Sequence, residues 1–174
     1  METLRLQIRL AEIADAGLIY RLWTDPRVLA QVGFPQGLRT DTEQIAADIS
    51  ARGADPLRQL LIVGKRAEGT AIGQCKLGRP DAEGIAETDI KLLPEYWGQG
   101  FGVEVKRALV DYLFAHTGCL AVQATPNINN AASIRMQEAV GGVRVGEGTS
   151  EFPENMRAWT TPVRYYVYRV YRPK

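Results

Sequence analysis

The sequence has few groups that bind metal ions. It contains two cysteines, Cys75 and Cys119, and one histidine, His116, and no CxxC spacing occurs. A structural zinc site uses about four such ligands, so we expect no metal. The cysteines are most simply small buried residues, and unpaired cysteines are typical of a reducing compartment, which favours the cytoplasm.

The sequence also lacks an excess of charge and any long apolar run. It has 21 Lys and Arg against 20 Asp and Glu, for a formal net charge of +1. So weak a field predicts neither nucleic acid nor a membrane surface as the main partner. No unbroken apolar stretch is long enough for a signal peptide or a membrane span. With 174 residues, 45% of them hydrophobic, the chain is expected to form a single domain over residues 1–174.

Hydrophobic periodicity predicts a strand at the start and helices after it. Leu4, Leu6, Ile8 and Leu10 alternate with polar residues, which is the pattern of a half-buried strand. The pattern of residues 15–33 predicts a helix that stops near Asp25 and Pro26, followed by a second short helix.

A third helix is predicted from cap spacing. Thr40 and Glu43 have the spacing of a capping box, and the apolar residues after them extend the helix to about Arg52.

The rest of the chain alternates between strand and helix patterns. Three strands are followed by a helix, a strand, a helix and two strands, in the segments 59–66, 71–78, 85–93, 101–117, 120–125, 130–140, 143–147 and 162–171. There is no internal repeat. The order predicts a mixed α/β fold in layers around one sheet.

Three glycines precede the helix predicted from residue 101. In "EYWGQGFG" they are Gly98, Gly100 and Gly102. The N–H groups and the dipole of a helix start favour an anion such as a phosphate, and glycines let that anion approach the backbone. Val103 stands where a GxGxxG fingerprint needs its third glycine, and no GxxxxGK[ST] occurs. A tight connection without a ligand remains the alternative.

Two motifs together carry a family resemblance. "LLPEYWGQGFGVE", followed by "NINNAASIRMQEAVGG", resembles the GNAT superfamily of acyl-CoA-dependent N-acyltransferases, in particular the Rim-type branch of ribosomal-protein N-terminal acetyltransferases. The family's loop has Gln or Arg, two variable residues, Gly, one variable residue, then Gly or Ala; Trp97, Gly100 and Gly102 take these places. The aromatic departs from the superfamily pattern but is familiar in the Rim-type branch. Asn130 and Ser133 match the second motif.

The resemblance implies a fold and a co-substrate. The fold is a mixed, mostly antiparallel sheet with helices on both faces, in which the parallel strands 87–93 and 120–125 splay apart around the pantetheine arm of acetyl-CoA. The residues implied to hold the cofactor belong to the first of these strands, the glycine loop and the second motif. They are Ile90, Leu92, Leu93, Gly98, Gln99, Gly100, Phe101, Gly102, Val103, Asn130 and Ser133.

The implied reaction is direct transfer of an acetyl group from acetyl-CoA to a primary amine in a ternary complex. The amine must lose a proton, and Glu87 is the candidate base because Rim-type relatives carry a glutamate there. An ordinary solvated carboxylate is the alternative, and Asp89 shares its strand face. The departing thiolate benefits from a proton donor, but the second motif lacks the tyrosine that many members use. Ser133 is the candidate substitute, against a purely structural role with Asn130 as helix cap.

Several alternatives stay open. A tyrosine of "RYYVYRVY" could be the proton donor, and a His116–Cys119 pair could act as a nucleophile. A non-catalytic CoA-binding or regulatory module would use the same fold. The acceptor, whether a peptide N-terminus or a small amine, should enter near residues 33–39 and 148–162, whose mixed charges select none of these. An exposed sheet edge could support a homodimer.

Overall fold

The computed structural model describes residues 1–173 except 52, 54 and 58. These residues build a seven-stranded sheet in the order β1-β2-β3-β4-β5-β7-β6. The β4–β5 pair is parallel and the other neighbouring pairs are antiparallel, which confirms the mixed sheet. The strands are β1 (Leu6–Leu10), β2 (Leu60–Lys65), β3 (Ala71–Leu77), β4 (Ile85–Leu92), β5 (Ala121–Ala124), β6 (Val143–Ser150) and β7 (Val163–Tyr171).

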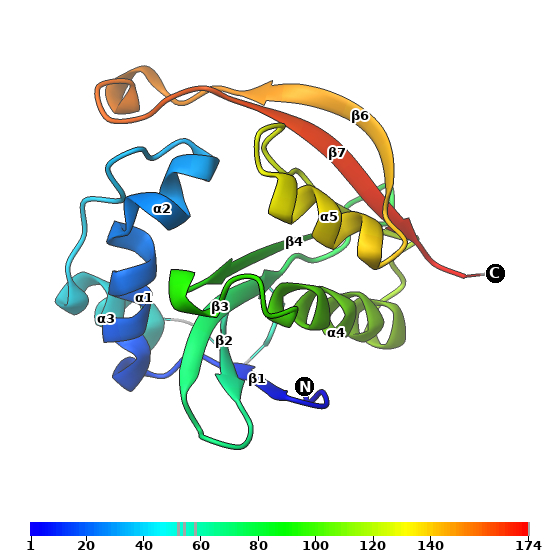
Figure 1. Cartoon of the computed structure of the whole chain (residues 1–174), viewed down its shortest axis with the longest axis horizontal. Helices are drawn as coiled ribbons and strands as arrows, with labels where there is room; N and C mark the ends of the chain where they lie inside the picture. Colours follow the sequence, from blue (N-terminus) through cyan, green and yellow to red (C-terminus); the bar gives the residue numbers. More distant parts are fainter. Residues whose placement is uncertain (52, 54, 58, 174) are drawn as a thin grey trace.

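Helices alternate with the strands as the sequence predicted. The helices are α1 (Ala16–Thr24), α2 (Pro26–Leu29), α3 (Thr42–Ser50), α4 (Phe101–His116) and α5 (Ala131–Ala139). Single 3-10 turns lie at η1 (Ile13–Asp15), η2 (Ala30–Val32), η3 (Pro94–Tyr96) and η4 (Glu154–Met156). Figure 1 shows α1, α2 and α3 grouped together and α4 lying beside α5. Within the described residues, no helix is long and apolar enough to cross a bilayer.

The two groups of helices cover opposite faces of the sheet. Successive side chains of a strand point to opposite faces. In β2, Leu61 and Val63 pack in one core cluster with Leu109 of α4, whereas Leu60 and Ile62 pack in a second cluster with α1 and α3. The sheet is therefore a central layer between helices, which confirms the predicted fold class.

The opening strand is shorter than predicted. Leu6 and Ile8 are buried, but Leu4 is 89% exposed and precedes β1. The chain bends before Leu6, where the N–H of Thr3 donates to the Leu6 carbonyl at 2.9 Å. The alternation of apolar and polar residues begins at Leu4, two residues before the strand, because the sequence pattern does not reveal this bend.

Caps divide the N-terminal helices. The interruption lies where predicted, because Asp25 accepts from the N–H of Arg27 and Pro26 opens α2. The predicted capping box at Thr40 is wrong. Asp41 is the cap of α3, since its side chain accepts from the N–H of Gln44 at 2.8 Å. The helix ends at Ser50, and the predicted end at position 52 lies outside the described residues.

The parallel strands separate after three rungs. Ile85, Ala86 and Glu87 of β4 pair with β5, and the last rung joins Glu87 to Gln123. Beyond this rung β4 continues to Leu92 while pairing only with β3 on its other side. One edge of β4 thus loses its strand partner, as the resemblance implied.

Candidate active site

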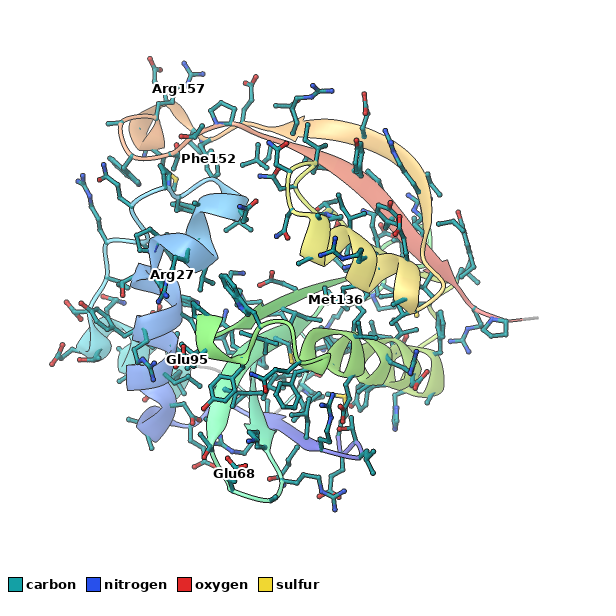
Figure 2. All side chains as sticks on the ribbon, viewed as in Figure 1. Arg27, Glu68, Glu95, Met136, Phe152 and Arg157 are labelled. Atoms are coloured by element: carbon teal, nitrogen blue, oxygen red, sulfur yellow. The ribbon has the colours of Figure 1, made fainter. Side chains whose placement is uncertain are left out.

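The glycine loop holds a backbone that other residues adopt with strain. Gly98 and Gly100 have φ values of 73° and 80°, in the left-handed region. Gly102 is a helical residue, and a Cβ there would lie 3.1 Å from the sulfur of Met136 on α5. Figure 2 shows Met136 on the side of α5 that faces α4. The glycines therefore have steric reasons of their own, whether or not a phosphate approaches.

The loop ends in unpaired donors at the start of a 16-residue helix. Gly100 is the N-cap of α4, and the N–H of Glu104 donates to the Gly100 carbonyl at 3.2 Å. This bond closes the first turn and leaves the N–H groups before it without an intrahelical acceptor. Such donors, together with the positive end of the helix dipole, form a site for an anion.

An arginine before β1 fixes the loop from outside. Arg5 donates from Nη1 to the Gln99 carbonyl at 3.0 Å and from Nε to Glu104 at 2.7 Å. Its guanidinium also lies 4.4 Å from the centre of the Phe101 ring. The Gln99 side chain turns back to the Glu95 carbonyl at 3.0 Å. These contacts restrain the backbone of the loop from both of its ends.

A cavity of about 960 Å³ joins the loop to the separated strands. Ten of the predicted site residues line it: Glu87, Ile90, Leu92, Gly98, Gly100, Phe101, Gly102, Val103, Asn130 and Ser133. Two predicted residues do not. Gln99 is held by Glu95, and Leu93 is 2% exposed and packs against α1 and α2.

Glu87 stands at the closed end of the gap between the strands. Its Oε1 accepts from Nε2 of Gln123 at 2.9 Å, and Oε1 of Gln123 accepts from Nε of Arg169 at 2.9 Å. The arginine turns the amide so that its NH₂ group faces Glu87. Asp89 is on the same face of the regular strand and also lines the cavity, but it forms an ion pair with Lys91. Of the two carboxylates, Glu87 is the one that forms no ion pair among the described residues.

The second motif starts α5. Asn130 is the N-cap, and its Oδ1 accepts from the Ser133 N–H at 3.0 Å. The side chain of Asn130 therefore has the structural role that the sequence left as an alternative. Both residues still line the cavity, opposite β4.

The other candidate nucleophile and proton donors lie elsewhere. Cys119 is fully buried, and His116 stacks on Tyr112 with ring centres 4.2 Å apart. Neither lines the cavity, so they form no nucleophilic pair there. The four tyrosines of the last strand lie outside it as well. Tyr96 is the tyrosine in the cavity wall, a position the sequence did not indicate.

The opposite wall of the cavity comes from α2 and η2. Arg27, Val28, Gln31 and Val32 line it, and Oε1 of Gln31 is buried without a hydrogen-bond partner. An unpaired buried acceptor costs about 1–3 kcal/mol. A ligand N–H could satisfy it.

The two loops predicted at the mouth do meet. The ring centres of Phe34 and Phe152 are 5.2 Å apart, and the N–H of Thr161 donates to the Gly33 carbonyl at 2.9 Å. Figure 2 places Phe152 in the β6–β7 connection beside α2. These loops lie outside the cavity lining, so the wall itself belongs to α2 and η2.

Lys106 is a cavity residue that the sequence reasoning missed. It lies on α4, is 1% exposed, and donates from Nζ to Oγ1 of Thr88 at 2.6 Å. Burial lowers the pKa of its ammonium to about 8. A signal was present, because Lys106 precedes the buried Leu109 and Val110 by three and four residues, which is the spacing of one helix face.

No metal centre is formed in the described part of the chain. Among residues 1–173 without 52, 54 and 58, no group of three or more His, Cys, Asp or Glu side chains could hold an ion.

The splayed parallel strand pair, the glycine loop at a helix start and the cavity between them are the features of an acyltransferase that uses acyl-CoA. The family model described as "Acetyltransferase (GNAT) domain" matches residues 5–143. The chain therefore belongs to the GNAT acetyltransferase family.

Relatives and solved structures agree with this assignment. The chain is 30% identical over 154 residues to "Uncharacterized N-acetyltransferase p20" of Bacillus licheniformis, covering 84% of this chain and 85% of that protein. It is similar in fold to spermidine N-acetyltransferase of Vibrio cholerae in complex with CoA and spermine, with a TM-score of 0.77, 20% identity and 95% coverage of both chains. The ribosomal-protein-S5-alanine acetyltransferase of Vibrio fischeri gives a TM-score of 0.74 and 19% identity, with 99% and 98% covered. The predicted membership of the GNAT superfamily is confirmed, and the fold is shared with a ribosomal-protein acetyltransferase.

Proposed function

We propose that this protein transfers the acetyl group of acetyl-CoA to a primary amine by direct attack in a ternary complex. The observation that carries the proposal is the end of the β4–β5 ladder at Glu87 and Gln123, where the cavity reaches the glycine loop. The pantetheine arm would lie along Ile90 and Leu92, and the pyrophosphate would bind the N–H groups before Glu104.

Glu87 is the proposed base. It lies at the point where the acetyl group would end, and its second carboxylate oxygen has no bound cation among the described ion pairs. A base there takes the proton from the attacking nitrogen. The acceptor enters from the α2 side, where Oε1 of Gln31 offers a buried hydrogen-bond acceptor to an amine.

Direct attack is favoured over a covalent acyl-enzyme. Cys75 and Cys119 are fully buried and absent from the cavity wall, and burial strongly raises the pKa of the Cys75 thiol. A thiol that stays protonated is a poor nucleophile. The amine acceptor itself is then the nucleophile.

A primary amine as acceptor fits two similar proteins. The Vibrio cholerae structure holds the polyamine spermine, and an AAC(6')-Ib structure with a TM-score of 0.67 holds ribostamycin. The experiment is a panel of peptides with free N-termini, amino acids, polyamines and aminoglycosides, each incubated with acetyl-CoA. We expect amine-dependent release of free thiol, with an acetylated product seen by mass spectrometry.

The panel also distinguishes the alternative. CoA binding raises the melting temperature in either case, because a ligand of the folded state stabilises it. A melting shift without thiol release for any amine would indicate a non-catalytic CoA-binding module. If the protein showed no melting shift with CoA and no thiol release, CoA binding itself would be overturned.

A further inference from the structure

Lys106 is a buried cation without a counter-ion. Its side chain is 1% exposed, and its Nζ donates to the neutral hydroxyl of Thr88 at 2.6 Å. None of the ion pairs formed by the described residues includes it. A buried ammonium is costly unless a partner compensates its charge. A negative charge that forms in the cavity would provide that compensation.

The ammonium lies where the acyl group would end. Thr88 follows Glu87, the last residue of β4 that pairs with β5, and both Thr88 and Lys106 line the cavity. Leu92 stands at the other end of this stretch, next to the glycine loop. Four residues of strand span about 13 Å, a length that an extended pantetheine arm covers.

Lys106 and the proposed base face the reacting bond from opposite sides of one strand. Adjacent strand residues point to opposite faces, so Thr88 points toward α4 and Glu87 points away from it. Lys106 reaches Thr88 from α4. A thioester at the separated edge of β4 would therefore have a carboxylate on one side and an ammonium on the other.

Two other charged groups of β4 near this position pair with each other. On β4, Asp89 pairs with Lys91, and both side chains share the face of Glu87. These groups are separated from Lys106 by the strand backbone.

The elements that pack against α4 provide no carboxylate that forms an ion pair with Lys106. Glu138 of α5 accepts from the Tyr168 hydroxyl at 2.9 Å, Arg135 lines the cavity, and Glu104 at the start of α4 binds Arg5. Burial is accordingly the cause that lowers the pKa of Lys106 to about 8, close to the value of about 8.5 of an ordinary thiol. The two groups are matched for exchange of a proton.

We propose that Lys106 is a catalytic residue that donates the proton to the departing CoA thiolate, a role that rests on the proposed function. The amine nitrogen forms a bond to the thioester carbon, and Glu87 takes a proton from that nitrogen. The C–S bond then breaks, its electron pair goes to sulfur, and a proton of the Lys106 ammonium passes to sulfur. The products are the amide and CoA thiol. Exchange with solvent returns the proton from Glu87 to Lys106.

The test compares Lys106→Met with Arg107→Met. Methionine keeps the unbranched apolar stem of lysine and lacks only its charged end. Arg107 is an exposed cation one residue further along α4 that does not line the cavity. At saturating substrates we expect Lys106→Met to lose about 10²-fold in kcat or more. Its Kd for CoA, measured by calorimetry, should stay within about threefold of wild type. Arg107→Met should be unchanged in both.

The pH profile separates proton donation from a structural role. Wild-type kcat should fall at alkaline pH as Lys106 loses its proton, and this limb should be absent from Lys106→Met. Retention of kcat within about threefold in Lys106→Met, or an unchanged alkaline limb, would overturn the role. Acetylation of Lys106 itself, detected by peptide mass spectrometry, would also overturn it, because the side chain would then be a nucleophile. Absence of thiol release in wild type overturns the proposed function and this role together. Release in wild type with a rate within about threefold of it in Lys106→Met overturns the role alone.

Discussion

Gln123 donates a hydrogen bond from Nε2 to Oε1 of Glu87 at 2.9 Å, across the last rung that joins β4 to β5. Arg169 holds the other end of the amide at 2.9 Å. A carboxylate is thus fixed at the point where the parallel strands part. The pair of Glu87 and Gln123 therefore both marks the point where the strands separate and holds the proposed base in place.

Replacement of Glu87 by glutamine should separate chemistry from binding. The amide keeps the shape of the side chain but cannot take a proton, so kcat should fall by about 10²- to 10⁴-fold at neutral pH. The deficit should shrink as the pH approaches the pKa of the acceptor amine, where less base is needed. Steady-state kinetics across pH measure both effects.

Asp89→Asn is the matched control for this variant. Asp89 shares the face of Glu87 and lines the same cavity, but Lys91 pairs with it. Its loss should leave kcat within about threefold of wild type. The opposite ranking of the two variants would assign the proton to Asp89.

Two substitutions at Gly100 test the anion site. Asn and Asp tolerate the left-handed φ of 80° better than other side chains and have nearly equal size. Gly100→Asp adds a negative charge where the pyrophosphate should bind, so its Kd for CoA should rise about tenfold or more above that of Gly100→Asn. Calorimetry gives both values. Equal affinities would mean that the loop is a structural turn only.

Lys106→Met should stabilise the protein at neutral pH. Burial lowers the pKa of Lys106 from 10.5 to about 8. The difference of about 2.5 is worth roughly 3 kcal/mol, less about 1 kcal/mol for the lost hydrogen bond to Thr88. Below about pH 8 both the folded and the unfolded chain hold the proton, so the full cost is present.

The gain should depend on pH in a defined direction. Between about pH 8 and 10.5 the unfolded chain binds the proton that the folded chain has lost, so wild-type stability rises with pH. The advantage of Lys106→Met should therefore fade over this range. Urea unfolding at several pH values measures it, and a variant less stable than wild type at pH 7 would contradict the account of the buried charge.

Gln31→Met tests the acceptor side of the cavity. The buried Oε1 of Gln31 has no partner in the described structure, and an acceptor amine would supply one. Its removal should raise the acceptor KM by about tenfold and leave the Kd for CoA unchanged. Gln36→Met, an exposed residue outside the cavity lining, is the control. A rise in KM in both variants would remove Gln31 from acceptor recognition.

The sequence predicted the order of elements because periodicity and helix stops are local. Pro26 ended one helix and opened the next, and the alternation around Leu6 and Ile8 marked the first strand. The cap at Asp41 was missed by one position because both candidates, Thr40 and Asp41, are good capping residues.

The site was only partly predictable. The motifs indicated the glycine loop and Asn130, because each motif is a short continuous segment of the sequence. The contact between Lys106 and Thr88 joins a helix to a strand 18 residues earlier, and the unpaired Gln31 depends on how η2 packs. Such features arise from tertiary packing, which spacing alone does not encode.

The most direct test of the account is a crystal structure of the protein with acetyl-CoA. We expect the pyrophosphate on the N–H groups of residues 98–103, the pantetheine along Ile90 and Leu92, and the acetyl group beside Glu87, with the sulfur facing Lys106. Acetyl-CoA bound away from the gap between β4 and β5, or with its phosphates elsewhere than the glycine loop, would contradict the account.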